Sequence, residues 1–219
     1  GPGETQLETD RRLLGQRIKS LKKRLGKVQS QREQGRRSRQ RGGVPVVSLV
    51  GYTNVGKSTL FNKMTSAKVY ADDRLFATLD PTLRRVKLQE TELLIMADTV
   101  GFIRDLPHDL VESFSSTLEE TRDAELLLHV VDCGANDRDD LIHHVNEVLK
   151  QIEADEVRQV IIYNKIDKVD DISPRIDRDD EGNINRIWLS ARTGAGLELL
   201  REALHEYFPE ESLSEYVDA

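Results

Sequence analysis

Cysteine and long apolar runs are scarce in this chain of 219 residues. Its one cysteine, Cys133, excludes an internal disulfide and is typical of a reducing compartment. No stretch approaches the roughly 18 consecutive apolar residues of a membrane-spanning helix. No secretory leader is visible, and the first residue is Gly1 rather than Met. We therefore expect a fragment or processed form of a cytoplasmic protein with no membrane span.

Hydrophobic residues are also few, at 37%, whereas charged residues make up 32%, which indicates an exposed charged segment beside a globular part. The charge is uneven along the chain. Residues 1–43 hold 13 Lys and Arg against 4 acids, a net of +9, and the remainder holds 19 against 35, a net of −16. A basic arm on an acidic domain favours a polyanion partner such as nucleic acid. The charge distribution alone is explained equally well by a solvated helix face and a flexible linker with no such partner.

The basic arm carries a narrow apolar stripe. Its members are spaced at steps of 4, 3, 4 and 3, namely Leu14, Ile18, Leu21, Leu25 and Val28. This is the seam of a coiled-coil helix, whose partner lies upstream, lies in another chain, or is absent. Residues 29–43 are mostly Gln, Arg, Ser and Gly, which is typical of a linker. We expect a basic helix and linker over residues 1–41, a globular domain over 42–210, and a tail or the start of a C-terminal region over 211–219.

Strand and helix patterns alternate from Val44 onwards, which indicates an α/β fold with a mostly parallel, six-stranded sheet and helices on both faces. The acidic, turn-rich stretch 170–185 is predicted to be a surface loop. The predicted strands are 46–50, 84–89, 92–97, 126–131, 160–163 and 187–189, and the predicted helices are 58–65, 110–121, 141–152 and 197–207.

A phosphate-binding loop lies between the first predicted strand and helix. Its residues are Gly51-Tyr52-Thr53-Asn54-Val55-Gly56-Lys57-Ser58, followed by Thr59, and they match G-x-x-x-x-G-K-[ST]. Glycines let the backbone curl around an anion, and its N–H groups and the helix N-terminus then face the phosphates. Lys57 adds a point charge at the β- and γ-phosphates, and the hydroxyl of Ser58 is a ligand for Mg²⁺.

Two further loops are placed to read the base. Asn164-Lys165-Ile166-Asp167 follows a predicted strand, and the carboxylate of Asp167 can accept both the N1–H and the 2-amino N–H of guanine. Adenine offers neither donor and would leave the carboxylate unpaired, so the predicted ligand is GTP or GDP. Ser190-Ala191-Arg192 follows the next strand, and we expect the backbone N–H of Ala191 to meet the guanine O6.

A fourth motif is placed to sense the γ-phosphate. Asp98-Thr99-Val100-Gly101 lies at the end of a predicted strand. We expect Asp98 to hold Mg²⁺ through a water and the N–H of Gly101 to contact the γ-phosphate.

In this order, the motifs resemble the translation-factor-like class of P-loop GTPases over about residues 44–208. Three further stretches and the opening of the chain resemble the HflX family of ribosome-associated GTPases. These are Phe76-Ala77-Thr78-Leu79-Asp80-Pro81-Thr82, Asp98-Thr99-Val100-Gly101-Phe102-Ile103, Leu106-Pro107-His108 and Gly1-Pro2-Gly3-Glu4-Thr5-Gln6-Leu7-Glu8.

The resemblance implies a magnesium-dependent GTPase domain and a partner. The helix from about Thr5 would be the second arm of a helical pair in an N-terminal domain. The protein would act in the cytoplasm, as a monomer, on the large ribosomal subunit and its rRNA, in subunit dissociation, rescue or assembly. The basic arm would then contact RNA.

The family pattern assigns the first switch to Phe76, Ala77, Thr78, Leu79 and Asp80, with Thr78 as the second protein ligand of Mg²⁺ after Ser58. Thr82 is a competing candidate for that ligand. Lys57, Thr78 and Gly101 are then the expected catalytic residues.

Phe102 stands where many GTPases have a glutamine that orients the attacking water. An aromatic ring cannot do this, so we expect slow hydrolysis that a partner stimulates. The alternatives are a nucleotide-gated RNA-binding module whose hydrolysis is incidental, a P-loop ATPase or small-molecule kinase, and a coiled-coil dimer built on the apolar seam.

Overall fold

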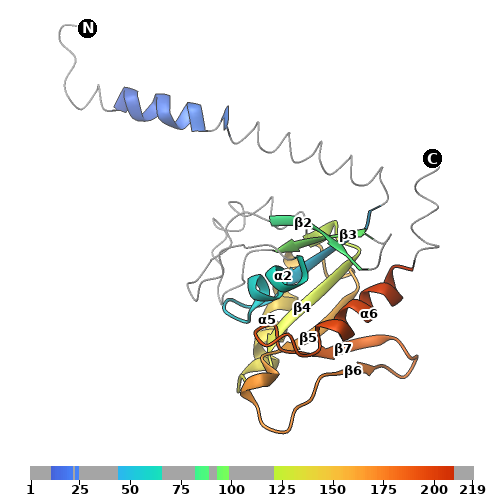
Figure 1. Cartoon of the computed structure of the whole chain (residues 1–219). Coiled ribbons are helices and arrows are strands. Elements are labelled where there is room, and N and C mark those ends of the chain that lie inside the picture. The colour runs from blue at the N-terminus through green and yellow to red at the C-terminus, as the bar shows by residue number, and fades with distance from the viewer. Residues whose placement is uncertain are drawn as a thin grey trace, which may run out of the picture. The chain divides into compact units, whose positions relative to one another are not determined.

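The computed structural model describes residues 11–21, 23–24, 44–65, 82–88, 93–98 and 121–209 (Figure 1). The chain divides into two compact units, residues 1–43 and 44–219. In the first unit residues 11–21 and 23–24 are helical, as the apolar periodicity predicted. Leu14, Ile18 and Leu21 of the seam are each more than half exposed. Leu25 and Val28 lie outside the described residues.

The second unit is built on a seven-stranded sheet with the order β2-β3-β1-β4-β5-β7-β6 (Figure 1). The five central strands run parallel, and the edge strands β2 and β6 run antiparallel to their neighbours. The mostly parallel sheet is therefore confirmed. The strands are β1 (Val46–Val50), β2 (Thr82–Lys87), β3 (Leu93–Asp98), β4 (Leu126–Asp132), β5 (Gln159–Asn164), β6 (Arg175–Arg178) and β7 (Ile184–Trp188).

The sheet has one strand more than the six we expected. The stretch 170–185, predicted to be a loop, contains the whole of β6 and the start of β7. Only Ile176 in β6 is apolar, and Arg175 and Arg178 are exposed. A charged strand of this kind is protected against pairing with other chains at a sheet edge, but it has no apolar run that marks it in the sequence.

Helices cover both faces of the sheet, as predicted. α2 (Lys57–Thr65) and α6 (Leu197–Tyr207) contribute Leu60, Phe61 and Leu200 to one buried apolar cluster, whereas α5 (Arg138–Gln151) contributes Leu149 to a second. Alternate residues of β1 divide between the two clusters, because successive strand side chains point to opposite faces. The helices in the described ranges all fall short of the length and apolarity that a bilayer crossing demands. The predicted helix 110–121 lies almost entirely outside those ranges.

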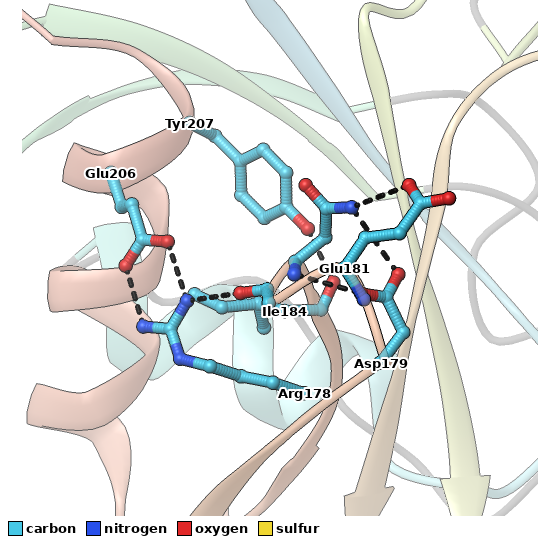
Figure 2. Close-up of polar contacts among 8 residues, drawn as sticks. Arg178, Asp179, Glu181, Ile184, Glu206 and Tyr207 are labelled. Atoms are coloured by element: carbon cyan, nitrogen blue, oxygen red, sulfur yellow. Dashed lines mark hydrogen bonds and ion pairs between the residues drawn. The ribbon is translucent and has the colours of Figure 1, made fainter.

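The hairpin of β6 and β7 is fastened to α6 (Figure 2). Arg178 forms two parallel hydrogen bonds with Glu206, with Nη1 to Oε1 at 2.7 Å and Nη2 to Oε2 at 2.8 Å. One residue further along α6, the hydroxyl of Tyr207 donates to the carbonyl of Ile184 at 2.5 Å. Because β7 leads directly into the loop at residues 189–192, these contacts hold the strand from which that loop starts.

Acidic side chains close the turn between β6 and β7 (Figure 2). Oδ1 of Asp179 accepts the backbone N–H groups of Glu181 at 3.0 Å and of Asn183 at 2.8 Å. The carboxylate thus stabilises its own turn.

Two adjacent leucines of α6 provide a test of the core. Leu200 is fully buried, whereas Leu199 is only partly buried. We expect Leu200→Ala to lower the free energy of unfolding by about 2–5 kcal/mol, because it leaves a cavity under the sheet. Leu199→Ala is the matched control and should cost less than half as much. Urea denaturation followed by circular dichroism measures both, and equal losses would contradict this placement of the core.

Candidate functional site

The predicted motifs meet at one edge of the sheet. Parallel strands present their carboxyl ends on the same side, which is where ligands bind in α/β folds. The loop at 51–56 follows β1, the loop at 165–168 follows β5, and the loop at 189–196 follows β7. Together they line a cavity of about 300 Å³, whose wall includes Asn54, Gly56, Thr59, Asn164, Lys165, Asp167, Lys168, Ala191 and Arg192.

The loop after β1 depends on two glycines. Gly51 has a φ of +142° and Gly56 a φ of +98°, values that side chains disfavour. A Cβ on Gly51 would collide with the carbonyl of Val130, and one on Gly56 would collide with the amide of Asn164. At these two positions the loop therefore lies against β4 and β5 with no room for a side chain. α2 begins at Lys57, so the helix N-terminus opens onto the loop.

Lys57 is held over this loop. Its side chain is buried, and Nζ donates to the carbonyls of Gly51 at 3.1 Å and Tyr52 at 2.9 Å. Burial lowers the pKa of Lys57 to about 8, although the negative charge of Asp98 acts in the opposite direction. The ammonium group is thus positioned where a phosphate bound in the loop would meet it.

Oxygen ligands suited to a magnesium ion lie next to the loop. Ser58 is the second residue of α2, and Asp98 is fully buried at the end of β3. Asp98 pairs with Leu49 on one side and with Thr82 on the other. Hydroxyl and carboxylate oxygens are the donors that Mg²⁺ prefers. Within the described ranges no three His, Cys, Asp or Glu residues gather as a metal site, so an ion here would also need phosphate and water ligands.

Asn164 joins the three loops. Its Nδ2 donates to the carbonyl of Val55 at 2.8 Å, and its Oδ1 accepts the backbone N–H of Ala191 at 2.9 Å. The side chain is buried, and both ends of its amide are satisfied by protein. Ala191 was expected to donate to guanine O6; in this structure its N–H donates to Asn164, and the contact with the base stays a prediction.

Asp167 presents a carboxylate to the cavity. Its Oδ1 accepts a short hydrogen bond from the hydroxyl of Ser190, and its Oδ2 lies 2.7 Å from Nη2 of Arg192. The Ser190 hydroxyl, with the Arg192 charge, holds the pKa of this carboxyl below its ordinary value. Oδ2 is buried beside Arg192 and accepts no hydrogen bond. An ionised carboxylate can accept the two N–H donors of guanine once Arg192 moves away from Oδ2.

Lys165 has a partner that the sequence motifs did not include. The residue is in the left-handed conformation, with a φ of +67°. Its Nζ donates to the carbonyl of Asn54 at 2.7 Å and to Oδ2 of Asp132 at 2.8 Å. Asp132 is the last residue of β4, opposite Asn164 in the strand register. An acid that ends an apolar strand at the ligand edge of a parallel sheet is the signal that could have identified it.

The two switch segments lie outside the described residues. They comprise Phe76, Ala77, Thr78, Leu79 and Asp80 in the first, and Thr99, Val100, Gly101, Phe102 and His108 in the second. Thr82 is described and begins β2. The choice between Thr78 and Thr82 as a magnesium ligand stays a prediction.

The family profile described as "50S ribosome-binding GTPase" matches residues 46–165, and one described as "GTP-binding GTPase Middle Region" matches residues 1–39. Among curated proteins, GTPase HflX of Escherichia coli strain K12 is 59% identical over 206 residues, which are 94% of this chain and 48% of that protein. GTPase HflX of Caldanaerobacter subterraneus is 48% identical over 96% of this chain and 48% of that protein. The chain thus spans about half the length of these relatives.

Solved structures agree on the fold. The complex of SsGBP with GDP has a TM-score of 0.65 at 25% identity and covers 94% of this chain and 62% of that one. Era of Aquifex aeolicus bound to GDP.AlF4⁻ has a TM-score of 0.60 at 22% identity, covering 76% of this chain and 57% of that one. The predicted P-loop GTPase fold is therefore confirmed.

The low pKa of Lys57 predicts a pH dependence of nucleotide binding. Below about pH 8 the ammonium is charged, and it loses its proton as the pH rises through that value. A phosphate attracts only the charged form, so affinity for GDP should fall about fourfold between pH 7 and pH 8.5. Isothermal titration across this range measures the effect.

Lys57→Arg is the control for that titration, because a guanidinium stays protonated throughout. Whatever its absolute affinity for GDP, we expect that affinity to change less than twofold over the same pH range. A wild-type affinity that is equally flat would show that Lys57 keeps its charge.

Proposed function

The chain belongs to the 50S ribosome-binding GTPase family, and its matches to GTPase HflX bear out the resemblance seen in its motifs. On this premise we propose that it binds GTP and hydrolyses it to GDP and phosphate. The observation that carries the proposal is that the phosphate loop (51–56) and the ionised carboxylate of Asp167, in the base loop (165–168), line one cavity. Lys57 donates to two carbonyls of that phosphate loop.

In the bound state the phosphates would lie in the loop 51–59, where backbone N–H groups and the N-terminus of α2 supply positive potential. Lys57 would exchange its bonds to the carbonyls of Gly51 and Tyr52 for phosphate oxygens. At the other end Asp167 would accept N1–H and the 2-amino group of guanine. The stems of Lys165 and Arg192 line the cavity and would flank the ring.

A magnesium ion fits the oxygen donors described above. We propose Ser58 and Thr78 as its direct protein ligands and Asp98 as a ligand through water. When bound, the ion neutralises charge on the β- and γ-phosphates. Gly101 would donate its N–H to the γ-phosphate, so that the segments around Thr78 and Gly101 respond to its loss as switches.

Hydrolysis is proposed to be slow in the chain by itself. Phe102 stands directly after Gly101 and offers no group to orient the attacking water. Lys57 and the loop N–H groups can polarise the phosphates, but an external group would have to position the water.

We propose that the partner supplying this group is the large ribosomal subunit, in the cytoplasm, and that the protein acts there as a monomer in subunit dissociation, rescue or assembly. The family description and the net charge of +9 over residues 1–43 support this choice. A second candidate function is a nucleotide-gated RNA-binding module whose hydrolysis is incidental, and Phe102 is the observation that favours it.

Asp167→Asn tests the recognition of guanine. An amide cannot accept both guanine donors, so affinity for GDP should fall about 100-fold or more. Xanthosine diphosphate has a carbonyl at C2, which can accept the N–H of the new amide. It should therefore bind to the variant more tightly than it binds to the wild type. Asp140→Asn, which changes an exposed carboxylate of α5, is the control and should leave both affinities unchanged. Comparable binding of ADP and GDP by the wild type would refute guanine recognition.

GTP turnover with and without purified large ribosomal subunits tests the partner. The protein should carry its upstream domain for this experiment, because the chain spans only half of its relatives. We expect at least tenfold stimulation, well within the range that partners supply to slow GTPases. Lys57→Ala should abolish both the basal turnover and the turnover stimulated by subunits. Rapid turnover by the protein alone, or no response to subunits, would count against the proposal.

A further inference from the structure

One carboxylate beside the cavity has no role in the function proposed above. Asp132 ends β4 and does not line the cavity itself. We propose that Asp132 is a positioning residue, which holds Lys165 in the orientation that fixes the base loop against the phosphate loop. This inference rests on the proposed nucleotide site.

The position of Asp132 is set by the sheet and by the turn that follows it. Asp132 and Asn164 are opposite each other in the parallel pair of β4 and β5, and the N–H of Cys133 extends this ladder to the carbonyl of Asn164 at 3.0 Å. Oδ1 of Asp132 accepts the N–H of Gly134 at 3.1 Å. In the same turn Nη1 of Arg138 donates to the carbonyl of Cys133 at 3.2 Å. The carboxylate is thus anchored by the N–H of Gly134 in the turn that follows it, and Arg138 of α5 bonds to the same turn.

The other carboxylate oxygen is directed at Lys165. Oδ2 lies 2.8 Å from Nζ, and the two side chains are only 26% and 19% exposed. A pair this shielded is screened less by salt than an open surface pair. The same ammonium donates to the carbonyl of Asn54 at 2.7 Å, so it links β4 to the phosphate loop.

Lys165 needs such support for two reasons. Its left-handed backbone is disfavoured for a residue with a Cβ, so the surroundings must hold it in place. Lys165 also lines the same cavity as Asp167, whose carboxylate is an alternative anionic partner for the ammonium. Asp132 provides a fixed negative partner that keeps Nζ on Asn54 and the aliphatic stem along the cavity wall.

Asp132 acts through Lys165 and does not contact the edge of the base. Its loss should therefore weaken the binding of all purine nucleoside diphosphates by the same factor. Inosine diphosphate lacks the 2-amino group that Asp167 recognises. A variant of Asp132 should therefore lose affinity for GDP and inosine diphosphate by the same factor, whereas Asp167→Asn changes the ratio between them.

The test is a double-mutant cycle in the 219-residue chain. Asp132→Asn keeps an acceptor for the N–H of Gly134 but removes the charge, and Lys165→Met keeps an unbranched stem but removes the ammonium. We expect Asp132→Asn to weaken GDP binding about tenfold, mainly through faster dissociation, and less than twofold when Lys165 is already Met. Displacement of fluorescent GDP measures both the affinity for GDP and its rate of dissociation. Equal losses in the two backgrounds would overturn the inference, because a merely structural role is independent of Lys165.

Glu153→Gln is the matched control. It removes the charge of another carboxylate paired with a basic side chain, Arg122, outside the lining of the cavity, and should change GDP affinity less than twofold. An unchanged affinity in Asp132→Asn, or a shift in its ratio of GDP to inosine diphosphate, would also reject the positioning role. Failure of the wild type to bind GDP would instead reject the nucleotide site on which the inference rests.

Discussion

The buried amide of Asn164 is the contact on which the rest of the site depends. It joins the phosphate loop at Val55 to the loop after β7 at Ala191. Loss of one partner would leave a buried polar group unsatisfied, at a cost of about 1–3 kcal/mol. Gly56 makes the contact possible, because any side chain there would occupy the space of the amide. A motif associated with base recognition thus also builds the phosphate site.

Two lysines share one physical arrangement around this amide. Lys57 and Lys165 each direct an ammonium group at backbone carbonyls of the loop 51–54, and each has an acid nearby. The negative charge of Asp98 counteracts the effect of burial on the pKa of Lys57, and Asp132 forms an ion pair with Lys165. The loop is therefore organised by cations before an anion arrives, which reduces the ordering that binding would otherwise require. An acidic domain can attract a polyphosphate at this edge because Lys57, Lys165, Lys168 and Arg192 place positive charge there.

The support of the base loop reaches beyond the motifs to the edge of the sheet. The connection from β5 to β7 includes β6, and the resulting hairpin is held to α6 by Arg178 and Tyr207 (Figure 2). Ser190 follows this hairpin, and its hydroxyl sets the ionisation of Asp167. Trp188, stacked on Tyr163 with ring centroids 4.2 Å apart, packs the same strand end. The carboxylate proposed to recognise the base is thus held from the ends of both β5 and β7.

The sequence by itself determined the α/β class, the mostly parallel sheet, the exact bounds of α6 and the three loops that line the cavity, because apolar periodicity and glycine spacing are local signals. It did not reveal β6, whose alternating charges resemble a loop. Nor did it reveal that the N–H of Ala191 serves Asn164, or that Asp132 serves Lys165. Only the tertiary structure decided these pairings, because each joins residues at least 27 positions apart whose meeting depends on strand register. Register is set by the packing of the whole sheet and leaves no mark in a short motif.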